Sequence, residues 1–205
     1  MKKVVLASRN KHKAQEISRI LKDLKVKVLT LDNFPKAPEV REDGKTLEEN
    51  AIKKAVKIAK FTKSLTISDD SGLEVNELKG LPGVRSARFA GPGCTYSDNN
   101  AKLLRLMKAV PIKKRRAAFK CVIAVADERG LIGTAEGVVS GFIGFESKGK
   151  HGFGYDPVFV VPKYKKTFAQ LGPKIKNKIS HRAKALHKAH DIIQKYFKSR
   201  RSLLA

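Results

Sequence analysis

The sequence predicts an α/β fold with a mixed central sheet, and two features of the chain lead to this prediction. In the first part of the chain, apolar runs of strand length alternate with stretches whose apolar residues recur every three or four positions, as on one face of a helix. After residue 116, three apolar stretches follow one another with only short turns between them, which is typical of antiparallel pairing. Both patterns in one chain favour a mixed sheet.

The first expected elements follow one another closely. An apolar strand over 4–7 leads into a helix whose apolar face covers 14–24, and the next strand is expected over 26–31. Thr46 followed by Glu49 has the pattern of a capping box and predicts that a second helix begins there.

The second half of the chain is expected to complete the sheet. Ser97 is predicted to cap one helix and Ser180 to cap the last one, because a serine hydroxyl accepts a hydrogen bond from a free N–H of the first turn. Between them, strands are expected over 117–126, 131–139 and 141–145, with a hairpin turn joining the first two.

Composition describes a chain with a real core and a strong excess of positive charge. Hydrophobic residues make up 41% of the 205 residues, and 44 Lys and Arg against 19 Asp and Glu give a net charge of +25. Such a chain attracts polyanions, for example phosphorylated metabolites or nucleic acid. Two cysteines argue against a disulfide scaffold and a zinc site. No apolar stretch reaches the ~18 residues of a membrane span, so we expect a cytoplasmic protein with no membrane partner.

Two adjacent carboxylates, Asp69 and Asp70, follow a short apolar run over 65–67 that is expected to be a buried strand. Side chains at the end of a strand are expected to face a cleft rather than the core. Two neighbouring negative charges repel one another, so a hard cation or a proton is the expected third party. The alternative is an acidic turn that only caps the next element.

A cationic loop between the first strand and the first helix has the composition of a phosphate site. Free N–H groups and the helix dipole attract anions at a helix N-terminus. The alternative is an ordinary strand–helix turn with solvated lysines, since the glycines of a Walker loop are missing. The loop consists of Ser8, Arg9, Asn10, Lys11, His12 and Lys13.

A glycine-rich segment over 149–157 carries two aromatic residues, Phe153 and Tyr155, followed by Asp156. Aromatic rings offer flat faces to a planar heterocycle, and a carboxylate accepts hydrogen bonds from ring N–H groups. The alternative is an aromatic turn packed on the core. Further along, His181 and Arg182 begin the last helix, where they are either solvated or donors to a ligand carbonyl.

Together, these loops offer cations for phosphate, carboxylates for a metal, aromatic faces for a base, and hydrogen-bond donors. This combination indicates a nucleoside triphosphate bound with a divalent cation, because Mg²⁺ usually binds one or two carboxylates together with substrate phosphates. In that setting a carboxylate such as Asp70 can orient or deprotonate a water molecule.

Five segments stand in a fixed order within Val4 to Leu186: SRNKHK, SDDSGL, GLPGVRSARFAG, GFGYDPVF and KISHRAKAL. Together they closely resemble the inosine triphosphate pyrophosphatase family, which hydrolyses non-canonical purine nucleoside triphosphates. The resemblance implies one domain over 1–205, with a long mixed central sheet flanked by helices that form two lobes with the active-site cleft between them. It also implies Mg²⁺-dependent hydrolysis of ITP, dITP and XTP to the monophosphate and pyrophosphate, and a homodimer.

The resemblance also implies roles for individual residues. Asp70 is the expected catalytic aspartate and a metal ligand, and Glu42, with Glu39 as the other option, is the second metal carboxylate. The loop from Ser8 to Lys13 is expected to hold the triphosphate and sugar, chiefly through Asn10 and Lys13. The other substrate-binding residues that it implies are Lys54, Ser71, Arg88, Phe153, Gly154, Tyr155, Asp156, Lys176, His181 and Arg182, the last two reading the keto edge of the purine.

Two other functions fit parts of the sequence. The net charge and the basic runs over 113–116 and 200–201 favour a nucleic-acid-binding protein without nucleotide turnover, although the basic residues are spread along the whole chain. A regulatory module that binds a nucleotide without cleaving it would use the same loops as the enzyme. Of these three hypotheses, only the pyrophosphatase predicts nucleotide turnover. The pyrophosphatase does not require nucleic acid as a partner.

Overall fold

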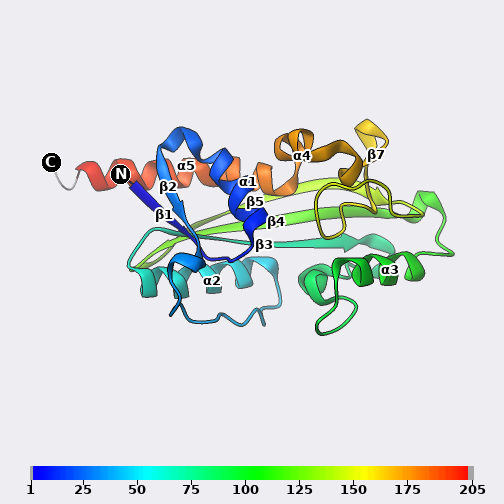
Figure 1. Cartoon of the computed structure of the whole chain (residues 1–205), viewed down its shortest axis with the longest axis horizontal. Coiled ribbons are helices and arrows are strands. Elements are labelled where there is room, and N and C mark those ends of the chain that lie inside the picture. Colours follow the sequence, from blue (N-terminus) through cyan, green and yellow to red (C-terminus); the bar gives the residue numbers. More distant parts are fainter. Residues whose placement is uncertain (1, 203–205) are drawn as a thin grey trace. The chain divides into compact units, whose positions relative to one another are not determined.

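The computed structural model describes residues 2–202, and helices and strands alternate in the first part of the chain, whereas three strands follow one another in the second (Figure 1). The strands are β1 (Lys2–Leu6), β2 (Val26–Leu29), β3 (Thr66–Val75), β4 (Arg116–Asp127), β5 (Gly130–Ile143), β6 (Phe159–Val161) and β7 (Lys166–Thr167). The α-helices are α1 (Lys11–Ile20), α2 (Leu47–Thr62), α3 (Tyr96–Leu106), α4 (Phe168–Ile179) and α5 (His181–Ser202). Short 3₁₀-helices are η1 (Lys22–Leu24), η2 (Leu31–Asn33), η3 (Asn76–Leu78), η4 (Gly83–Arg88), η5 (Ile112–Lys114) and η6 (Pro162–Tyr164).

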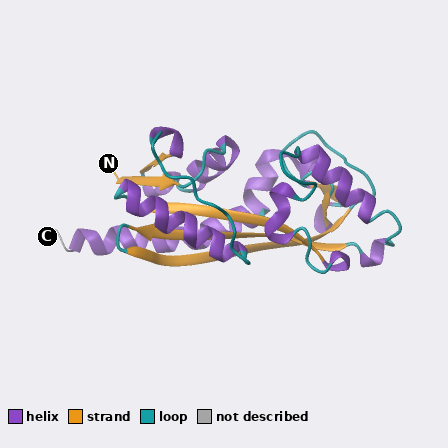
Figure 2. Ribbon diagram, turned by 90° about the horizontal axis from the view of Figure 1, so that it is seen from below, coloured by secondary structure: helices purple, strands orange, loops and turns teal. Residues whose placement is uncertain are grey.

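The strands form one seven-stranded sheet in the order β2-β1-β3-β4-β5-β6-β7. Strand β1 pairs in parallel with β2 and β3, whereas β6 pairs in antiparallel fashion with β5 and β7. The sheet is therefore mixed and has helices around it (Figure 2), which confirms the α/β fold expected from the sequence. None of the helices within residues 2–202 has both the length and the apolar character needed to cross a membrane.

The chain forms two compact units. Of the described residues, unit 1 comprises 2–70, 121–137 and 183–202, and unit 2 comprises 71–120 and 138–182. Strands β3, β4 and β5 each contribute one part to each unit. Each unit has a hydrophobic core of its own.

The core of unit 1 follows from the alternation of side chains along a strand. Leu6 of β1 packs with Ile17 of α1 and Leu186 of α5, whereas the preceding residue, Val5, packs with Ile58 of α2. Helices α1 and α5 accordingly lie on one side of the unit 1 strands and α2 lies on the other (Figure 1). Any polar side chain on a neighbouring strand is presented to one of these two sides.

The core of unit 2 combines aromatic rings with aliphatic side chains. The ring of Phe119 on β4 lies 4.6 Å from that of Phe159 on β6, and Phe159 stacks on Phe168 of α4 at 5.4 Å. Leu73 of β3 and Leu103 of α3 are fully buried in the same cluster. The strands and helices that carry the site residues of unit 2 are thus fixed around one packed core.

The structure corrects the expected position of the carboxylate pair. Strand β3 runs from Thr66 to Val75, so Asp69 and Asp70 lie in the middle of a strand rather than at the end of one. The strand continues through them because each buried carboxylate meets a cation, Lys13 for Asp69 and Lys54 for Asp70. The apolar run alone could not indicate this, since the partners come from other elements.

Two helix starts also differ from the sequence prediction. The cap of α3 is Thr95 and not Ser97, because Thr95 forms a reciprocal capping box with Asp98. Helix α4 was not expected, and it places Lys176 within a helix rather than in a loop. Its apolar periodicity is interrupted at Gly172, which has a φ of +73°, and at the Pro173 that follows it.

Candidate active site

The loop that leads into α1 is held by its own polar side chains. Ser8 Oγ accepts a hydrogen bond from the Asn10 N–H at 3.1 Å, and Asn10 Oδ1 accepts one from the Lys13 N–H at 3.2 Å. Asn10 therefore caps α1, which leaves the first turn of the helix to face solvent with Lys11 exposed. A helix start of this kind attracts anions.

The cations of this loop point in different directions. Arg9 is exposed and donates to the Leu31 carbonyl oxygen at 3.1 Å, with its Nη1 atom 3.7 Å from Asp32. Lys13 Nζ lies 3.0 Å from Asp69 Oδ2. The side chain of His12 lies outside the described part of the structure. Lys13 is thus the loop cation that the structure brings to a carboxylate of β3.

Neighbouring residues on β3 face opposite sides of the sheet, and this separates the two aspartates. Asp69 faces the α1 side and meets Lys13, whereas Asp70 faces the α2 side, where its Oδ1 atom lies 3.1 Å from Lys54 Nζ. The two carboxylates therefore do not form one side-by-side pair, as the sequence had suggested. Asp70 has another acidic neighbour instead.

That neighbour is Glu42, and Lys54 joins it to Asp70. The Lys54 ammonium donates to Glu42 Oε1 at 2.7 Å, to the Asp69 carbonyl oxygen at 2.9 Å and to Asp70 Oδ1. Lys54 is buried on the inner face of α2, while Glu42 comes from the loop before that helix and is partly exposed. Two carboxylates from distant parts of the chain thus converge on a single ammonium group.

The charges of this cluster do not balance. We call Lys13, Glu42, Lys54, Asp69 and Asp70 the unit 1 cluster, and its three carboxylates outnumber its two ammonium groups. Burial raises the pKa of the Asp70 carboxyl, and Lys54 only partly offsets this effect. Burial also opposes the charge of Lys54, but Asp70, Asp69 and Glu42 outweigh it and raise the pKa of that ammonium. The cluster therefore favours an additional positive charge.

The donor set of the unit 1 cluster fits Mg²⁺. Glu42 Oε1 and Asp70 Oδ1 are hard oxygen donors, and both already contact one positive charge, the Lys54 ammonium, at 2.7 and 3.1 Å. Within residues 2–202, no group of three or more His, Cys, Asp and Glu side chains forms a complete metal cage. Mg²⁺ does not need such a cage, because it keeps several waters and takes its remaining ligands from substrate phosphates.

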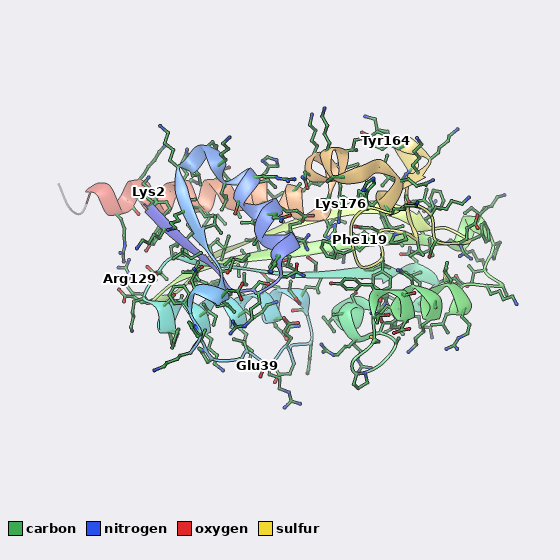
Figure 3. All side chains as sticks on the ribbon, in the orientation of Figure 1. Lys2, Glu39, Phe119, Arg129, Tyr164 and Lys176 are labelled. Atoms are coloured by element: carbon green, nitrogen blue, oxygen red, sulfur yellow. The ribbon has the colours of Figure 1, made fainter. Side chains whose placement is uncertain are left out.

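Glu39, the other option for the second metal carboxylate, lies elsewhere on the same loop. Its side chain is exposed, and Lys57 of α2 donates to its backbone carbonyl oxygen at 2.9 Å. Figure 3 shows Glu39 on the loop beside α2. Of the two glutamates, Glu42 is the one whose carboxylate shares a partner with Asp70.

In unit 2, an ion pair and an aromatic ring lie together. Lys176 Nζ is 2.6 Å from Asp156 Oδ2, and both side chains are almost fully buried. The same ammonium lies 4.3 Å from the centre of the Phe153 ring, and Asp156 Oδ2 also accepts from the Phe153 N–H at 2.9 Å. The segment 149–157 thus presents the Phe153 ring beside a desolvated ion pair.

His181 and Arg182 begin α5 next to this ring. The imidazole of His181 stacks on the ring of Phe119, which Figure 3 labels. The two ring centres are 4.7 Å apart and the rings are almost parallel. The Arg182 guanidinium is buried, lies 5.5 Å from the centre of the Phe153 ring, and donates to Ser71 Oγ at 3.4 Å. Both side chains are held inside the unit, which argues against solvated residues at a helix start.

The aromatic segment is anchored from two sides. Tyr155 is buried in the core of unit 2, where its hydroxyl donates to the Ser86 carbonyl oxygen at 2.9 Å. Asn100 of α3 donates from Nδ2 to the Gly154 carbonyl oxygen at 3.0 Å, and Gly154 has a φ of +62° that favours glycine. Tyr155 therefore serves as an anchor of the segment, and Phe153 is the more accessible of the two rings.

Several residues with a role in this geometry were not singled out from the sequence. Phe119, Asn50 and Asn100 are buried within strands and helices, and Asp69 was noted only as a neighbour of Asp70. The one usable signal is an asparagine inside a predicted helix, where it is intrinsically unfavourable. Arg88, in contrast, was expected to bind phosphate, and its side chain is exposed on η4.

Comparisons with known proteins confirm the resemblance noted in the sequence. The chain matches the model of the Ham1 family over residues 4–192. A dITP/XTP pyrophosphatase from Desulforamulus reducens is 53% identical over 95% of this chain and 97% of that protein, and one from Clostridium perfringens is 48% identical over 93% and 97%. The solved structure of a HAM1 protein from Coxiella burnetii, with 40% sequence identity, has a TM-score of 0.87 and covers 95% of this chain and 100% of that one.

Proposed function

The chain belongs to the Ham1 family, and from this premise we propose that it hydrolyses dITP, XTP and ITP to the monophosphate and pyrophosphate. One water molecule is consumed for each Pα–O–Pβ linkage that is broken. Removing these nucleotides keeps deaminated purines out of the pool that polymerases use. The observation that carries the proposal is the convergence of Glu42 and Asp70 on the Lys54 ammonium.

We propose that Glu42 and Asp70 hold Mg²⁺. Bound there, the ion would neutralise phosphate charge and lower the pKa of a water molecule. Lys13 and the start of α1 bind the phosphate chain, since an ammonium and free N–H groups both favour anionic oxygen. Asp70 orients the attacking water and accepts its proton at a carboxylate oxygen.

Selection of the base is assigned to unit 2. Phe153 offers a flat face, Asp156 accepts from ring N–H groups, and His181 and Arg182 donate to the 6-keto oxygen of the purine. Adenine has an amino donor at that position, so these donors would face another donor. A buried polar group without a partner costs about 1–3 kcal/mol, which corresponds to a discrimination of about 5- to 150-fold.

We propose that the protein acts in the cytoplasm, where its nucleotide substrates are found, and as a homodimer. Large apolar side chains are exposed on unit 2, including Leu81, Leu106 and Phe145, and a second copy bound over them would remove them from water. Light scattering on the purified protein is expected to give twice the mass of the chain. The mass of a single chain at micromolar concentration would contradict the dimer.

A pyrophosphate-release assay with ITP, dITP, XTP, GTP and ATP, with and without Mg²⁺, tests the proposed function. We expect Mg²⁺-dependent release from the first three and much slower release from ATP. Binding of ITP without release would favour the regulatory module. Steeply salt-dependent binding of DNA or RNA without nucleotide turnover would favour the nucleic-acid-binding protein.

A further inference from the structure

Asn50 is a buried amide in the first turns of α2 that contacts the loop carrying Glu42. The residue is 1% exposed, and its Oδ1 atom accepts a hydrogen bond from the Gly44 N–H at 2.8 Å. Because that backbone group is a donor, the contact fixes which end of the amide faces the loop. The backbone two residues after Glu42 is thereby tied to α2.

The contact is close-fitting on both sides. A Cβ atom at Gly44 would lie 2.7 Å from Asn50 Oδ1 and 2.9 Å from the Cβ of Glu49, closer than real side chains approach. Glycine is therefore required for the loop to rest on Asn50. A loop that only connected two elements would not need such close packing.

Asn50 and Lys54 lie one helical turn apart, on the same buried face of α2. Lys54 holds the Glu42 carboxylate and Asn50 holds the backbone near it. A cation bound between Glu42 and Asp70 would compete with the Lys54 contact, but it would leave the Asn50 contact in place. The Asn50 contact is thus the one that keeps Glu42 positioned in both states.

The NH₂ end of the Asn50 side chain argues against a purely structural role for this residue. Asn50 Nδ2 is buried and has no hydrogen-bond partner among the described residues. A buried donor without a partner is unfavourable, and asparagine is a poor residue for a helix interior. An apolar side chain would fill this site at lower cost if packing were its only task.

We propose that Asn50 is a positioning residue that sets the Glu42 carboxylate for metal binding through its hydrogen bond to Gly44. The inference rests on the proposed function for its catalytic consequence, but the contact itself can be tested in the metal-free protein. Removing a residue that orients a metal ligand typically lowers metal affinity or activity by about 10- to 100-fold.

The test compares Asn50→Ala with Thr46→Ala. Thr46 Oγ1 accepts from the Glu49 N–H and caps the same helix, so its loss weakens the start of α2 without removing the Gly44 contact. We expect the Mg²⁺ concentration for half-maximal pyrophosphate release to rise at least about tenfold in Asn50→Ala and to stay within about twofold of the parent in Thr46→Ala. The dITP over dATP preference should not change in either variant.

Hydrogen exchange of the Gly44 amide, measured without metal or nucleotide, gives a second readout. Exchange should be fast in Asn50→Ala, and Asn50→Asp should restore slow exchange because its carboxylate still accepts the bond. Slow Gly44 exchange in a parent protein that releases no pyrophosphate would overturn the proposed function and leave the contact intact.

Gly44→Ala disturbs the same contact from the loop, and the double variant with Asn50→Ala removes the clash of the new Cβ with Asn50 Oδ1, whereas the close approach to the Cβ of Glu49 remains. We therefore expect the double variant to be no worse than Gly44→Ala alone, a non-additive result. Equal Mg²⁺ requirements in Asn50→Ala and Thr46→Ala, or unchanged Gly44 exchange in Asn50→Ala, would overturn the inference.

Discussion

The candidate site residues of the two units differ in the chemistry they offer. In unit 1, charged side chains meet opposite charges, and carboxylates outnumber the ammonium groups beside them. In unit 2, a buried ion pair and a guanidinium gather around one aromatic ring. The first set suits a metal ion and the triphosphate chain, which every nucleoside triphosphate has. The second set suits the base, which differs from one nucleoside triphosphate to another.

The two buried lysines show the same difference. Lys54 shares its ammonium among several oxygen atoms, and one of its partners, Glu42, is 37% exposed. Lys176 has Asp156 beside it in an almost dry environment, with side chains 6% and 2% exposed. A shared and partly solvated contact can be exchanged for a metal ion, whereas a desolvated pair is costly to break. We therefore assign an exchangeable role to Lys54 and a fixed role to Lys176.

The largest expected effect comes from Asp70→Asn in unit 1. Asparagine keeps the shape but cannot accept a proton from water, so we expect the rate of pyrophosphate release to fall by about 10²- to 10⁴-fold. Circular dichroism should show an intact fold, since Lys54 retains Glu42 and the Asp69 carbonyl oxygen. Retained Mg²⁺-dependent turnover would count against the role assigned to this carboxylate.

The next largest effect is expected from Asp156→Asn in unit 2, and it is an effect on stability. The variant leaves the Lys176 ammonium buried without a carboxylate, which typically costs about 3–5 kcal/mol in the free energy of unfolding. Urea unfolding measures this loss. The control is Glu146→Gln, because Glu146 pairs with Lys148 at the surface and such pairs contribute about 0–1 kcal/mol. Similar losses in both variants would remove the distinction between fixed and solvated pairs.

A smaller effect is expected from Asn100→Asp. The aspartate has the same shape but no donor for the Gly154 carbonyl oxygen, so the segment that carries Phe153 loses one anchor. A hydrogen bond of about 1 kcal/mol corresponds to a rise of about fivefold in KM for dITP, with kcat unchanged. Asn99→Asp is the matched control, since Asn99 is equally buried on α3 but bonds to Ala87 and Ala90 instead. A fall in kcat at constant KM would contradict the anchoring role.

The elements of the fold that the sequence predicted well are those whose signals are local. The apolar periodicity before Leu24 and the pairing of Thr46 with Glu49 indicate α1 and α2, and the structure has both helices there. Helix α4 lacked such a signal, because Gly172 and Pro173 interrupt its apolar face. The choice of Ser97 over Thr95 as a cap overlooked Asp98, which completes the capping box.

The candidate site was predictable where residue type alone indicates chemistry. Carboxylates, cations and an aromatic segment can be recognised in a sequence, and the structure brings Glu42 to Asp70 and Asp156 to Lys176. Partners that depend on tertiary packing were not predictable. The contact between Asn50 and Gly44 is one example, because it depends on how the loop lies against α2, which neither residue type indicates.

The central claim is that unit 1 cuts the phosphate chain and unit 2 selects the base. Pyrophosphate release gives the ratio of kcat/KM for dITP to that for dATP, and this ratio is the most direct test when Lys13→Ala and His181→Ala are measured side by side. We predict that Lys13→Ala lowers both values together and leaves the ratio unchanged, whereas His181→Ala narrows it by about 5- to 150-fold. A ratio that narrows in Lys13→Ala, or one that stays at the parent value in His181→Ala, would contradict the account.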